Sequence, residues 1–382
     1  MRVLLANSHG ADASAGGAER YVADLASGLR GRGHEVEILS AFPPRIRSSP
    51  APAHVLRSSD WRDDPLRRLG NHVGDVLSVP GRKLFRAVER ARPDVVHTGN
   101  LPGISTAIWE VARRLGVPVV HTLQDYHLVC PRVTLQRRDG TPCRPHPLLC
   151  GWRTRRLTRW SSALSDVIIV SEYLGRAHAG LFPAAGKHLV RYPLAPVAPH
   201  PLAEPHAPPR TIGYLGALEQ VKGIEELLSA IPALSDLGFT VQMAGNGRLR
   251  STVEQAAGES LRFAGPVYGS AKLDFIESCD LGIVPSRWAE PGGPNYTVLE
   301  WLAAGRPVLA STRGGLGEAR DLPGVVPVEP DAESIVEAVR RVRDEEAWRD
   351  LLGRVSQVED DRDVERWLDE HEAVYRQATG AA

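Results

Sequence analysis

Short apolar, β-rich runs alternate with longer amphipathic stretches along this chain, and this alternation constrains its fold more than any other feature. The first series of runs covers residues 3–5, 36–39, 95–96, 117–120 and 167–170. Nearly continuous apolar strands separated by helices are typical of a parallel sheet that helices cover on both faces. Between the first two runs, apolar residues recur at helical spacing over residues 17–30, which predicts the first helix.

A second series of the same kind covers residues 211–215, 240–243, 261–263, 281–284 and 307–310. The length of 382 residues suits two domains of about 150–200 residues each. We therefore predict an N-terminal α/β domain over residues 1–192 and a C-terminal one over 210–358. The proline-rich residues 193–209 are predicted to form an extended linker, and residues 359–382 contain an amphipathic helix at 364–377.

The composition excludes several classes of protein. Lys plus Arg and Asp plus Glu number 46 each, so the chain lacks the positive field on which nonspecific nucleic-acid binding depends. No apolar run approaches the ~18 residues that span a bilayer, and the N-terminus does not resemble a signal peptide, so we expect a cytoplasmic protein. Only four basic residues are lysine (Lys83, Lys187, Lys222 and Lys272), a scarcity that we attribute to genome composition.

Glycine-rich loops follow predicted strands in both domains, where doubly wound sheets bind their ligands. Gly16 and Gly17 open the first helix and allow an anion to approach its N-terminus, although a plain connecting loop has the same composition. The third glycine of a dinucleotide-binding fingerprint is absent, which disfavours a dehydrogenase. In the second domain, Lys222 lies between Gly216 and Gly223, where it is placed either to hold a diphosphate or to remain a solvated surface lysine.

A third loop, within residues 287–300, follows an apolar run and leads into a helix. Its Gly292-Gly293 pair offers backbone N–H donors, and Glu290 and Glu300 flank the pair. Glu300 is expected in the first turn of that helix, where a carboxylate complements the helix dipole. For Glu300 taken alone, this structural explanation is preferred.

These loops belong to sequence blocks that follow one another in a familiar order. The blocks are Gly16-Gly17-Ala18-Glu19, Pro93-Asp94-Val95-Val96-His97, His121-Thr122-Leu123-Gln124-Asp125-Tyr126, Cys130-Pro131-Arg132, residues 216–223, Ala244-Gly245-Asn246-Gly247 and residues 285–308. In this order they resemble the retaining, nucleotide-sugar-dependent glycosyltransferases of family four, a glycogen-synthase-like family, over nearly the whole chain. The resemblance implies a GT-B fold, in which two Rossmann-like, doubly wound α/β domains face each other across a cleft. It also implies that the C-terminal domain binds the donor, the N-terminal domain binds the acceptor, and the terminal helix packs back on the N-terminal domain.

The resemblance assigns roles to matching residues. Lys222 is expected to contact the donor diphosphate, Glu300 the ribose hydroxyls and Glu290 the transferred sugar. We assign Gly16, Gly17, Gly216, Asn246, Gly292 and Gly293 to donor binding together with Lys222 and Glu300, His121 to catalysis together with Glu290 and Lys222, and His97, Asn100, Asp125 and Tyr126 to acceptor binding.

Three positions depart from the family pattern. Ala217 replaces a usual arginine, so Arg248 or Arg20 is expected to supply the missing diphosphate contact. Nine residues separate Glu290 from Glu300, two more than is usual in the family. Gln124 stands where many relatives have histidine.

The chain offers weak candidates for a metal site. Cys130, Cys143 and Cys150 include no Cys-x-x-Cys pair and match no common zinc spacing. An Asp-x-Asp sequence within residues 359–363 lies in a charged stretch that we interpret as solvated. We therefore predict no metal and no cofactor, with a nucleotide sugar, expected to be UDP-linked, as co-substrate.

We predict a retaining transferase that moves a hexose-type sugar to a glycan, a lipid or a secondary metabolite. An inverting transferase or a nucleotide-sugar epimerase of the same fold is an alternative; it needs a base, for which His97, His121 and Asp125 are candidates. A second alternative is a sugar-nucleotide-binding protein without turnover.

Residues 153–160 form a basic cluster, which we interpret as a solvated helix face. Peripheral contact with a membrane and contact with an anionic acceptor are the alternatives.

Overall fold

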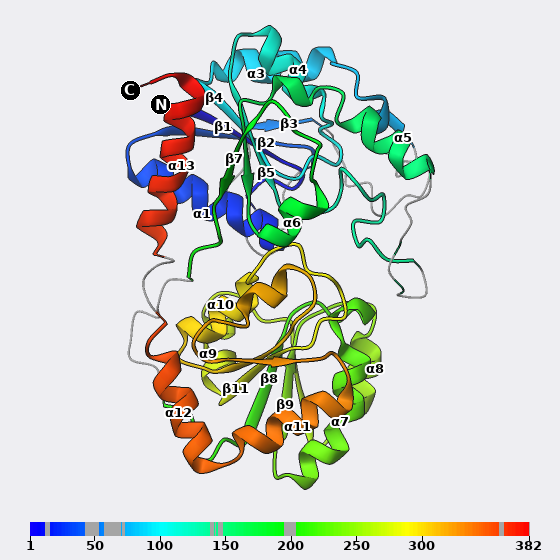
Figure 1. The fold of residues 1–382 in the computed structure, drawn as a ribbon, viewed down its shortest axis with the longest axis vertical. Helices are drawn as coiled ribbons and strands as arrows, with labels where there is room; N and C mark the ends of the chain where they lie inside the picture. Colours follow the sequence, from blue (N-terminus) through cyan, green and yellow to red (C-terminus); the bar gives the residue numbers. More distant parts are fainter. Residues whose placement is uncertain are drawn as a thin grey trace. The chain divides into compact units, whose positions relative to one another are not determined.

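The computed structural model describes residues 1–11, 16–42, 53–56, 70, 73–137, 141, 143, 148–194, 204–358 and 363–381. The chain divides into two compact units, which are Met1–Arg191 with Glu365–Ala382 (unit 1) and Tyr192–Val364 (unit 2). Each unit is a sheet with helices packed against it (Figure 1). Residues 195–203 of the predicted linker and residues 359–362, with part of the Asp-x-Asp sequence, lie outside the described residues.

Unit 1 contains a seven-stranded parallel sheet in the order β3-β2-β1-β4-β5-β6-β7. Its strands are β1 (Arg2–Asn7), β2 (Glu35–Ser40), β3 (His54–Val55), β4 (Val95–Thr98), β5 (Val119–Leu123), β6 (Asp166–Ile169) and β7 (Gly186–Leu189). Its labelled helices are α1 (Gly17–Gly31), α3 (Arg82–Ala91), α4 (Ala107–Arg114), α5 (Leu148–Leu157), α6 (Glu172–Ala177) and α13 (Val364–Thr379). The strand order reverses between β1 and β4, where Rossmann-like sheets bind ligands at the carboxyl ends of the strands.

Unit 2 repeats this plan with a six-stranded parallel sheet in the order β10-β9-β8-β11-β12-β13. Its strands are β8 (Thr211–Leu215), β9 (Thr240–Ala244), β10 (Leu261–Gly265), β11 (Leu281–Val284), β12 (Val308–Ser311) and β13 (Val325–Val328). Its helices are α7 (Ile224–Asp236), α8 (Arg250–Ala256), α9 (Ser270–Glu277), α10 (Tyr296–Ala303), α11 (Ala332–Val342) and α12 (Glu345–Val355).

Both faces of the unit 2 sheet are buried under helices. One apolar cluster joins β-strand side chains such as Val241 and Ile283 to residues of α7 and α11, including Leu227 and Ile335. A second cluster joins other strand residues to Trp301 of α10 and to residues of α9. Two cores on one parallel sheet define a doubly wound α/β domain, so the predicted fold class is confirmed.

Helix α13 packs on unit 1 through a buried chain of hydrogen bonds. His371 Nδ1 lies 2.7 Å from the Trp367 carbonyl, so it carries the proton and its Nε2 accepts from the Tyr21 hydroxyl at 2.5 Å. The Tyr21 oxygen then accepts from Thr122, whose oxygen accepts from His97 Nε2 at 2.6 Å. His97 Nδ1 accepts from the Tyr375 hydroxyl at 2.5 Å. This single direction of donation satisfies every member of the chain and keeps both histidines neutral.

Exposed ion pairs surround this buried chain. Arg32, just after α1, pairs with Glu365 at 2.6 Å and with Asp369 at 2.7 Å, and its neighbours raise the pKa of its guanidinium.

Among the helices of the described residues, none is both long and apolar enough to cross a membrane.

Candidate functional site

Four loops of unit 2 meet at the edge where β8 and β11 end. They follow β8, β9, β11 and β12, and the strand order reverses between β8 and β11. Gly223 has a φ of +76°, and a Cβ there would lie 1.9 Å from the Pro285 carbonyl oxygen, so only glycine lets the loops after β8 and β11 approach this closely. Gly314 has a φ of +65° and packs in the same way against Ala289.

Lys222 and Glu290 form an ion pair at this edge. Lys222 Nζ lies 2.6 Å from Glu290 Oε1, which also accepts from the Ser286 hydroxyl at 2.8 Å. The Glu290 side chain is 6% exposed, whereas Lys222 is 25% exposed and lies over the Trp288 ring. The lysine therefore faces accessible space with a buried carboxylate behind it, and it can hold an anion such as a phosphate.

Glu300, the second glutamate, forms an ion pair with Lys272. Glu300 Oε1 lies 2.5 Å from Nζ of Lys272, a residue of α9, and Glu300 is buried. Our expectation that Glu300 lies in a first helical turn is wrong, because Asn295 caps α10 and the helix begins at Tyr296, with no acidic residue in its first turn. Dipole complementation falls off beyond that turn, so it does not explain this carboxylate.

The loop between the two glutamates presents backbone donors. Gly292 and Gly293 are buried, and within the described chain neither N–H donates to a protein group. Buried N–H groups are rarely left without an acceptor, so these two are suited to oxygen atoms of a ligand. Gly216 and Asn246 lie in the neighbouring loops, which are joined by the bond from the Leu218 N–H to the Asn246 carbonyl at 2.9 Å.

The two arginines considered as substitutes at Ala217 lie in different units. Arg248 is in the loop after β9; its side chain is 90% exposed and pairs with Glu219 at 3.4 Å. Arg20 is on α1 of unit 1 and pairs with Asp24 at 3.4 Å. Arg248 therefore lies on the same edge as Lys222.

The carboxyl edge of the unit 1 sheet brings together Asn100, Gln124 and Asp125. These residues line a cavity of about 10 Å³, the size of one water molecule. Among the described residues, neither amide atom of buried Gln124 has a hydrogen-bond partner, and burial raises the pKa of Asp125 to about 6. The Asp125 carboxylate also accepts the His127 N–H at 2.7 Å. An unpaired buried amide beside a partly protonated carboxyl suits the hydroxyl groups of a sugar.

The other residues assigned in unit 1 are less accessible. Both ring nitrogens of His97 bond to protein groups, and burial lowers its pKa well below the ordinary range. His121 donates from Nδ1 to the Thr98 carbonyl, and burial lowers its pKa to about 3. Tyr126 is fully buried. Gly16 and Gly17 lie at the start of α1, but residues 12–15 of the preceding loop are outside the described residues.

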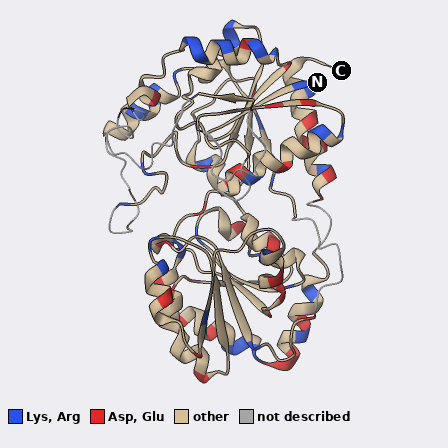
Figure 2. Ribbon diagram, turned by 180° about the vertical axis from the view of Figure 1, so that it is seen from behind, with Lys and Arg blue, Asp and Glu red and all other residues tan. Residues whose placement is uncertain are grey.

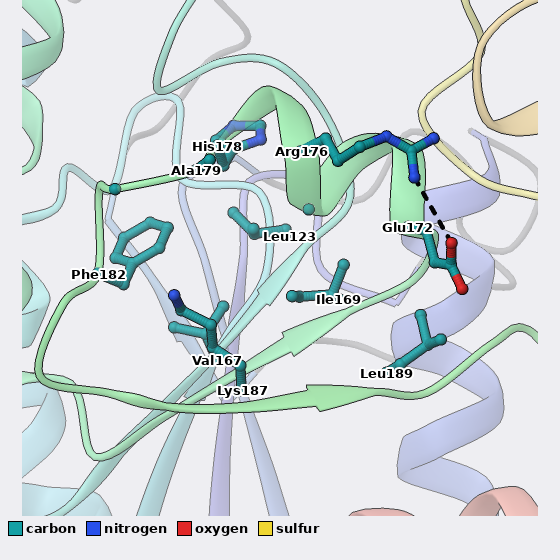
Figure 3. A pocket seen from close by; sticks show the side chains of 12 residues that line it. Leu123, Val167, Ile169, Glu172, Arg176, His178, Ala179, Phe182, Lys187 and Leu189 are labelled. Atoms are coloured by element: carbon teal, nitrogen blue, oxygen red, sulfur yellow. Dashed lines mark hydrogen bonds and ion pairs between the residues drawn. The ribbon is translucent and has the colours of Figure 1, made fainter.

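A larger cavity of about 440 Å³ lies beside β5, β6, β7 and α6 in unit 1. Figure 3 shows its wall, where Leu123, Val167, Ile169, Phe182 and Leu189 contribute apolar side chains. Leu123 also lines the small cavity at Gln124, so the two cavities share a wall. This pocket can accept an apolar group close to the polar edge.

Comparison with known proteins decides the family. Residues 15–193 match the family model described as Glycosyltransferase Family 4, and residues 209–345 match the model described as Glycosyl transferases group 1. The chain belongs to the family four glycosyltransferases. Members of this family transfer sugars, so the protein is a glycosyltransferase.

Individual relatives agree with this family four assignment. An uncharacterized 42.6 kDa protein in the cps region of Klebsiella pneumoniae is 27% identical over 342 residues, covering 85% of this chain and 89% of that protein. A glycogen synthase of Mycobacterium tuberculosis is 28% identical over 375 residues, covering 91% and 87%. The solved structure of Anabaena Alr3699/HepE in complex with UDP has a TM-score of 0.62 at 14% identity, covering 98% of this chain and 99% of that one. The GT-B fold is confirmed.

Sequence reasoning missed several residues of this family four site. Lys272 and Ser286 hold the two glutamates, and Asn7 fixes the edge of unit 1 by accepting the Asn100 N–H at 2.9 Å. The scarcity of lysine was a usable signal, because Lys222 and Lys272 are the lysines of unit 2 and each pairs with one of the two glutamates. Among the described residues, no group of three or more His, Cys, Asp or Glu side chains is arranged to hold a metal ion.

We expect Glu300→Gln to raise the dissociation constant of the nucleotide about tenfold and to change kcat little. A charged hydrogen bond contributes about 1.5–3 kcal/mol, and Glu300 is assigned to the ribose, away from the bond that breaks. Isothermal titration with the nucleoside diphosphate measures the change. Glu337→Gln is the control, because Glu337 pairs with Arg340 at 2.5 Å on α11, outside the loops of this site. If Glu300→Gln binds the nucleotide with normal affinity, the Glu300 carboxylate has only a structural role, which is its ion pair with Lys272.

Proposed function

We propose that this glycosyltransferase moves a hexose-type sugar from a UDP-sugar to an acceptor with retention of the anomeric configuration. The observation that carries the proposal is the Lys222–Glu290 pair, 2.6 Å apart, on glycine-rich loops. The nearby N–H groups of Gly292 and Gly293 donate to no protein group in the part of the chain that the structure describes. A cation and N–H donors at one sheet edge provide what the departure of a nucleoside diphosphate requires.

Each group has a part in the proposed reaction. Lys222 and the N–H groups of Gly292 and Gly293 stabilise the negative charge that develops on the leaving diphosphate. Glu290, fixed by Lys222 and Ser286, accepts hydrogen bonds from the sugar hydroxyls and orients the ring. Glu300, fixed by Lys272, holds the ribose.

Retention follows from attack on the face that the diphosphate leaves. The bond from the anomeric carbon to the phosphate oxygen breaks, the acceptor oxygen bonds to the same face of that carbon, and the acceptor proton moves to the departing phosphate. No protein base is then required. The low pKa values of His97 and His121 argue against these two residues as the base of an inverting transferase, because an imidazole with a pKa of about 3, as in His121, is a weak base at neutral pH.

The donor and acceptor classes rest on different observations. UDP is proposed because a structural neighbour, Anabaena Alr3699/HepE, is described in complex with UDP. The buried amide of Gln124 and the carboxyl of Asp125 favour a hydroxyl-bearing acceptor in unit 1. The adjoining apolar cavity of about 440 Å³ favours acceptors that carry an apolar group next to that hydroxyl, such as a lipid or a secondary metabolite, over a bare glycan.

We expect transfer to continue after exhaustive chelation and the product to keep the anomeric configuration of the donor. Lys222 and the loop N–H groups take the part that a divalent cation has in metal-dependent transferases. A screen of UDP-, ADP- and GDP-sugars against hydroxylated acceptors identifies the substrates, and NMR of the product assigns the anomeric centre. Activity that returns only with Mg²⁺ or Mn²⁺, or an inverted product, would refute this mechanism. Donor binding without hydrolysis or transfer would favour a sugar-nucleotide-binding protein instead.

A further inference from the structure

Exposed apolar side chains are concentrated in two segments of unit 1. Of nine large apolar residues that are exposed in the described parts of the chain, six lie in residues 73–79 and 148–152. They are Val73, Leu77, Val79, Leu148, Leu149 and Trp152, with Leu148 94% and Leu149 79% exposed. Single exposed apolar residues are ordinary, but a group of this size marks an interaction surface.

The two segments lie side by side. The Ser78 carbonyl accepts hydrogen bonds from Arg159 and from Trp160 Nε1, the latter at 3.1 Å, just beyond the end of α5. Arg153 of α5 also interacts electrostatically with Asp75 in the helical residues 73–77. The exposed residues of both segments therefore belong to one region of unit 1.

Helix α5 is fixed so that one side stays outward. Arg153 and Leu157 are buried, and Arg153 donates to the His127 carbonyl at 2.6 Å. Leu148, Trp152 and Arg155 recur at spacings of three and four residues, so they share the opposite, exposed side. The outward side thus changes from apolar at the start of the helix to basic toward its end.

Basic residues flank the apolar group on its other side as well. Helix α3 begins three residues after Val79 and buries Leu84, Ala87, Val88 and Ala91. Its exposed residues include Arg82, Lys83, Arg86 and Arg90, and none of these four has an ion-pair partner within the described chain. Figure 2 shows Lys and Arg on the helices of unit 1 at the top of the view.

The charge of this region differs from that of the whole chain. Residues 148–160 contain four arginines and no acidic residue, and residues 82–92 contain five basic residues and one acidic residue, whereas the whole chain is balanced at 46 of each sign. Burial, and to a smaller extent the proximity of Arg156, lower the pKa of Arg159.

We propose that this basic apolar surface, formed by Val73, Leu77, Val79, Leu148, Leu149 and Trp152 with the basic residues of α3 and α5, docks the protein on an anionic lipid bilayer. Leu and Trp side chains suit the boundary between headgroups and acyl chains, while arginine heads remain at the phosphates. Cores of protein interfaces are depleted of such charge, and nucleic acid offers no apolar layer for the leucines. The proposal is independent of the proposed sugar transfer.

Vesicle sedimentation without substrates tests the proposal. We expect the protein to bind vesicles of phosphatidylcholine with phosphatidylglycerol, to bind pure phosphatidylcholine at least about tenfold less, and to be released by high salt. The double variants Arg82→Glu/Arg86→Glu and Leu149→Ser/Trp152→Ser should each lower the partition coefficient about tenfold or more.

The control is a charge reversal on unit 2. Arg262 and Arg320 are exposed there, so Arg262→Glu/Arg320→Glu should leave vesicle binding unchanged. Absence of binding to anionic vesicles, equal binding to both vesicle types, or wild-type binding by both unit 1 variants would overturn the proposal. Full sensitivity to the arginine changes with none to Leu149→Ser/Trp152→Ser, together with displacement by heparin, would indicate a polyanion site instead of a bilayer surface. A wild-type far-UV circular dichroism spectrum and wild-type thermal unfolding in every variant verify that both units are folded.

Discussion

Unit 1 is expected to lose stability steeply as the pH falls from 6.5 to 5. Burial lowers the pKa of His371 and His178 to about 4, that of His121 to about 3, and that of His97 well below its ordinary range. In the unfolded chain a histidine titrates near pH ~6.5. Below that pH the unfolded chain therefore binds more protons than folded unit 1 does, so the free energy of unfolding decreases as the pH falls.

The expected loss is about 2 kcal/mol for each of the four histidines at pH ~5. Two carboxyl groups of unit 1 act in the opposite direction, because burial raises the pKa values of Asp125 and Glu370. The Asp125 pKa is raised to about 6, so its protonation favours the folded state by about 1 kcal/mol at pH ~5. The sum is comparable to the total stability of an ordinary domain, about 5–15 kcal/mol. Unit 2 contains only His200 and His206, so its stability should change less.

Chemical denaturation followed over a pH series measures this loss. His371→Asn keeps a donor near the Trp367 carbonyl and removes one titrating ring, so it should reduce the slope of stability against pH by close to one proton. His206→Asn is the control, because the His206 side chain is exposed and pairs with Asp280 at 2.8 Å in unit 2. A wild-type slope in the His371 variant would show that this ring is protonated in the folded state.

The interior of the fold and the edge strand β10 were predictable from sequence, but the other three sheet edges were not. Ten predicted strands are present, because a strand buried on both faces must be apolar throughout. The three strands that were missed, β3, β7 and β13, are all edge strands. β3 has two residues, β7 is half-exposed with the sequence Gly-Lys-His-Leu, and β13 contains Pro327, which an edge strand tolerates because one side has no partner.

The site was predictable where chemistry follows a local pattern. Lys222 was assigned from its loop and Glu290 from the family resemblance, but their direct pairing depends on the long-range contact between Gly223 and Pro285. Lys272 was missed because it lies on a helix without a glycine-rich loop, and only the sheet order brings it to Glu300. His97 illustrates the reverse, because it was assigned to acceptor binding, whereas Tyr375 of α13 occupies its Nδ1 and Thr122 of β5 occupies its Nε2.

Replacement of Lys222 by alanine is expected to reduce kcat by about 10²–10³-fold, which corresponds to about 2.7–4 kcal/mol of transition-state stabilisation. Its ammonium group is a partly exposed cation at the loop edge, and charge on the diphosphate increases as the glycosidic bond breaks. Uniform binding of ground and transition states would raise KM alone, so the loss must appear in kcat if Lys222 stabilises the leaving group. Steady-state kinetics with the donor identified by the screen gives both constants.

The ion pair with Glu290 makes a second, structural explanation possible, and a double-mutant cycle separates the two. Lys222→Ala leaves Glu290, which is 6% exposed, without its cation, so part of the loss arises from a displaced carboxylate. Glu290→Gln removes that charge while Ser286 still contacts the side chain. If Lys222 serves only to place Glu290, the double variant will be no slower than Glu290→Gln alone. If Lys222 acts on the diphosphate, kcat of the double variant will fall below that of Glu290→Gln by most of the factor that Lys222→Ala alone produces. Lys222→Arg should then recover part of kcat, because a guanidinium keeps the positive charge that the leaving group requires while its geometry differs from that of an ammonium.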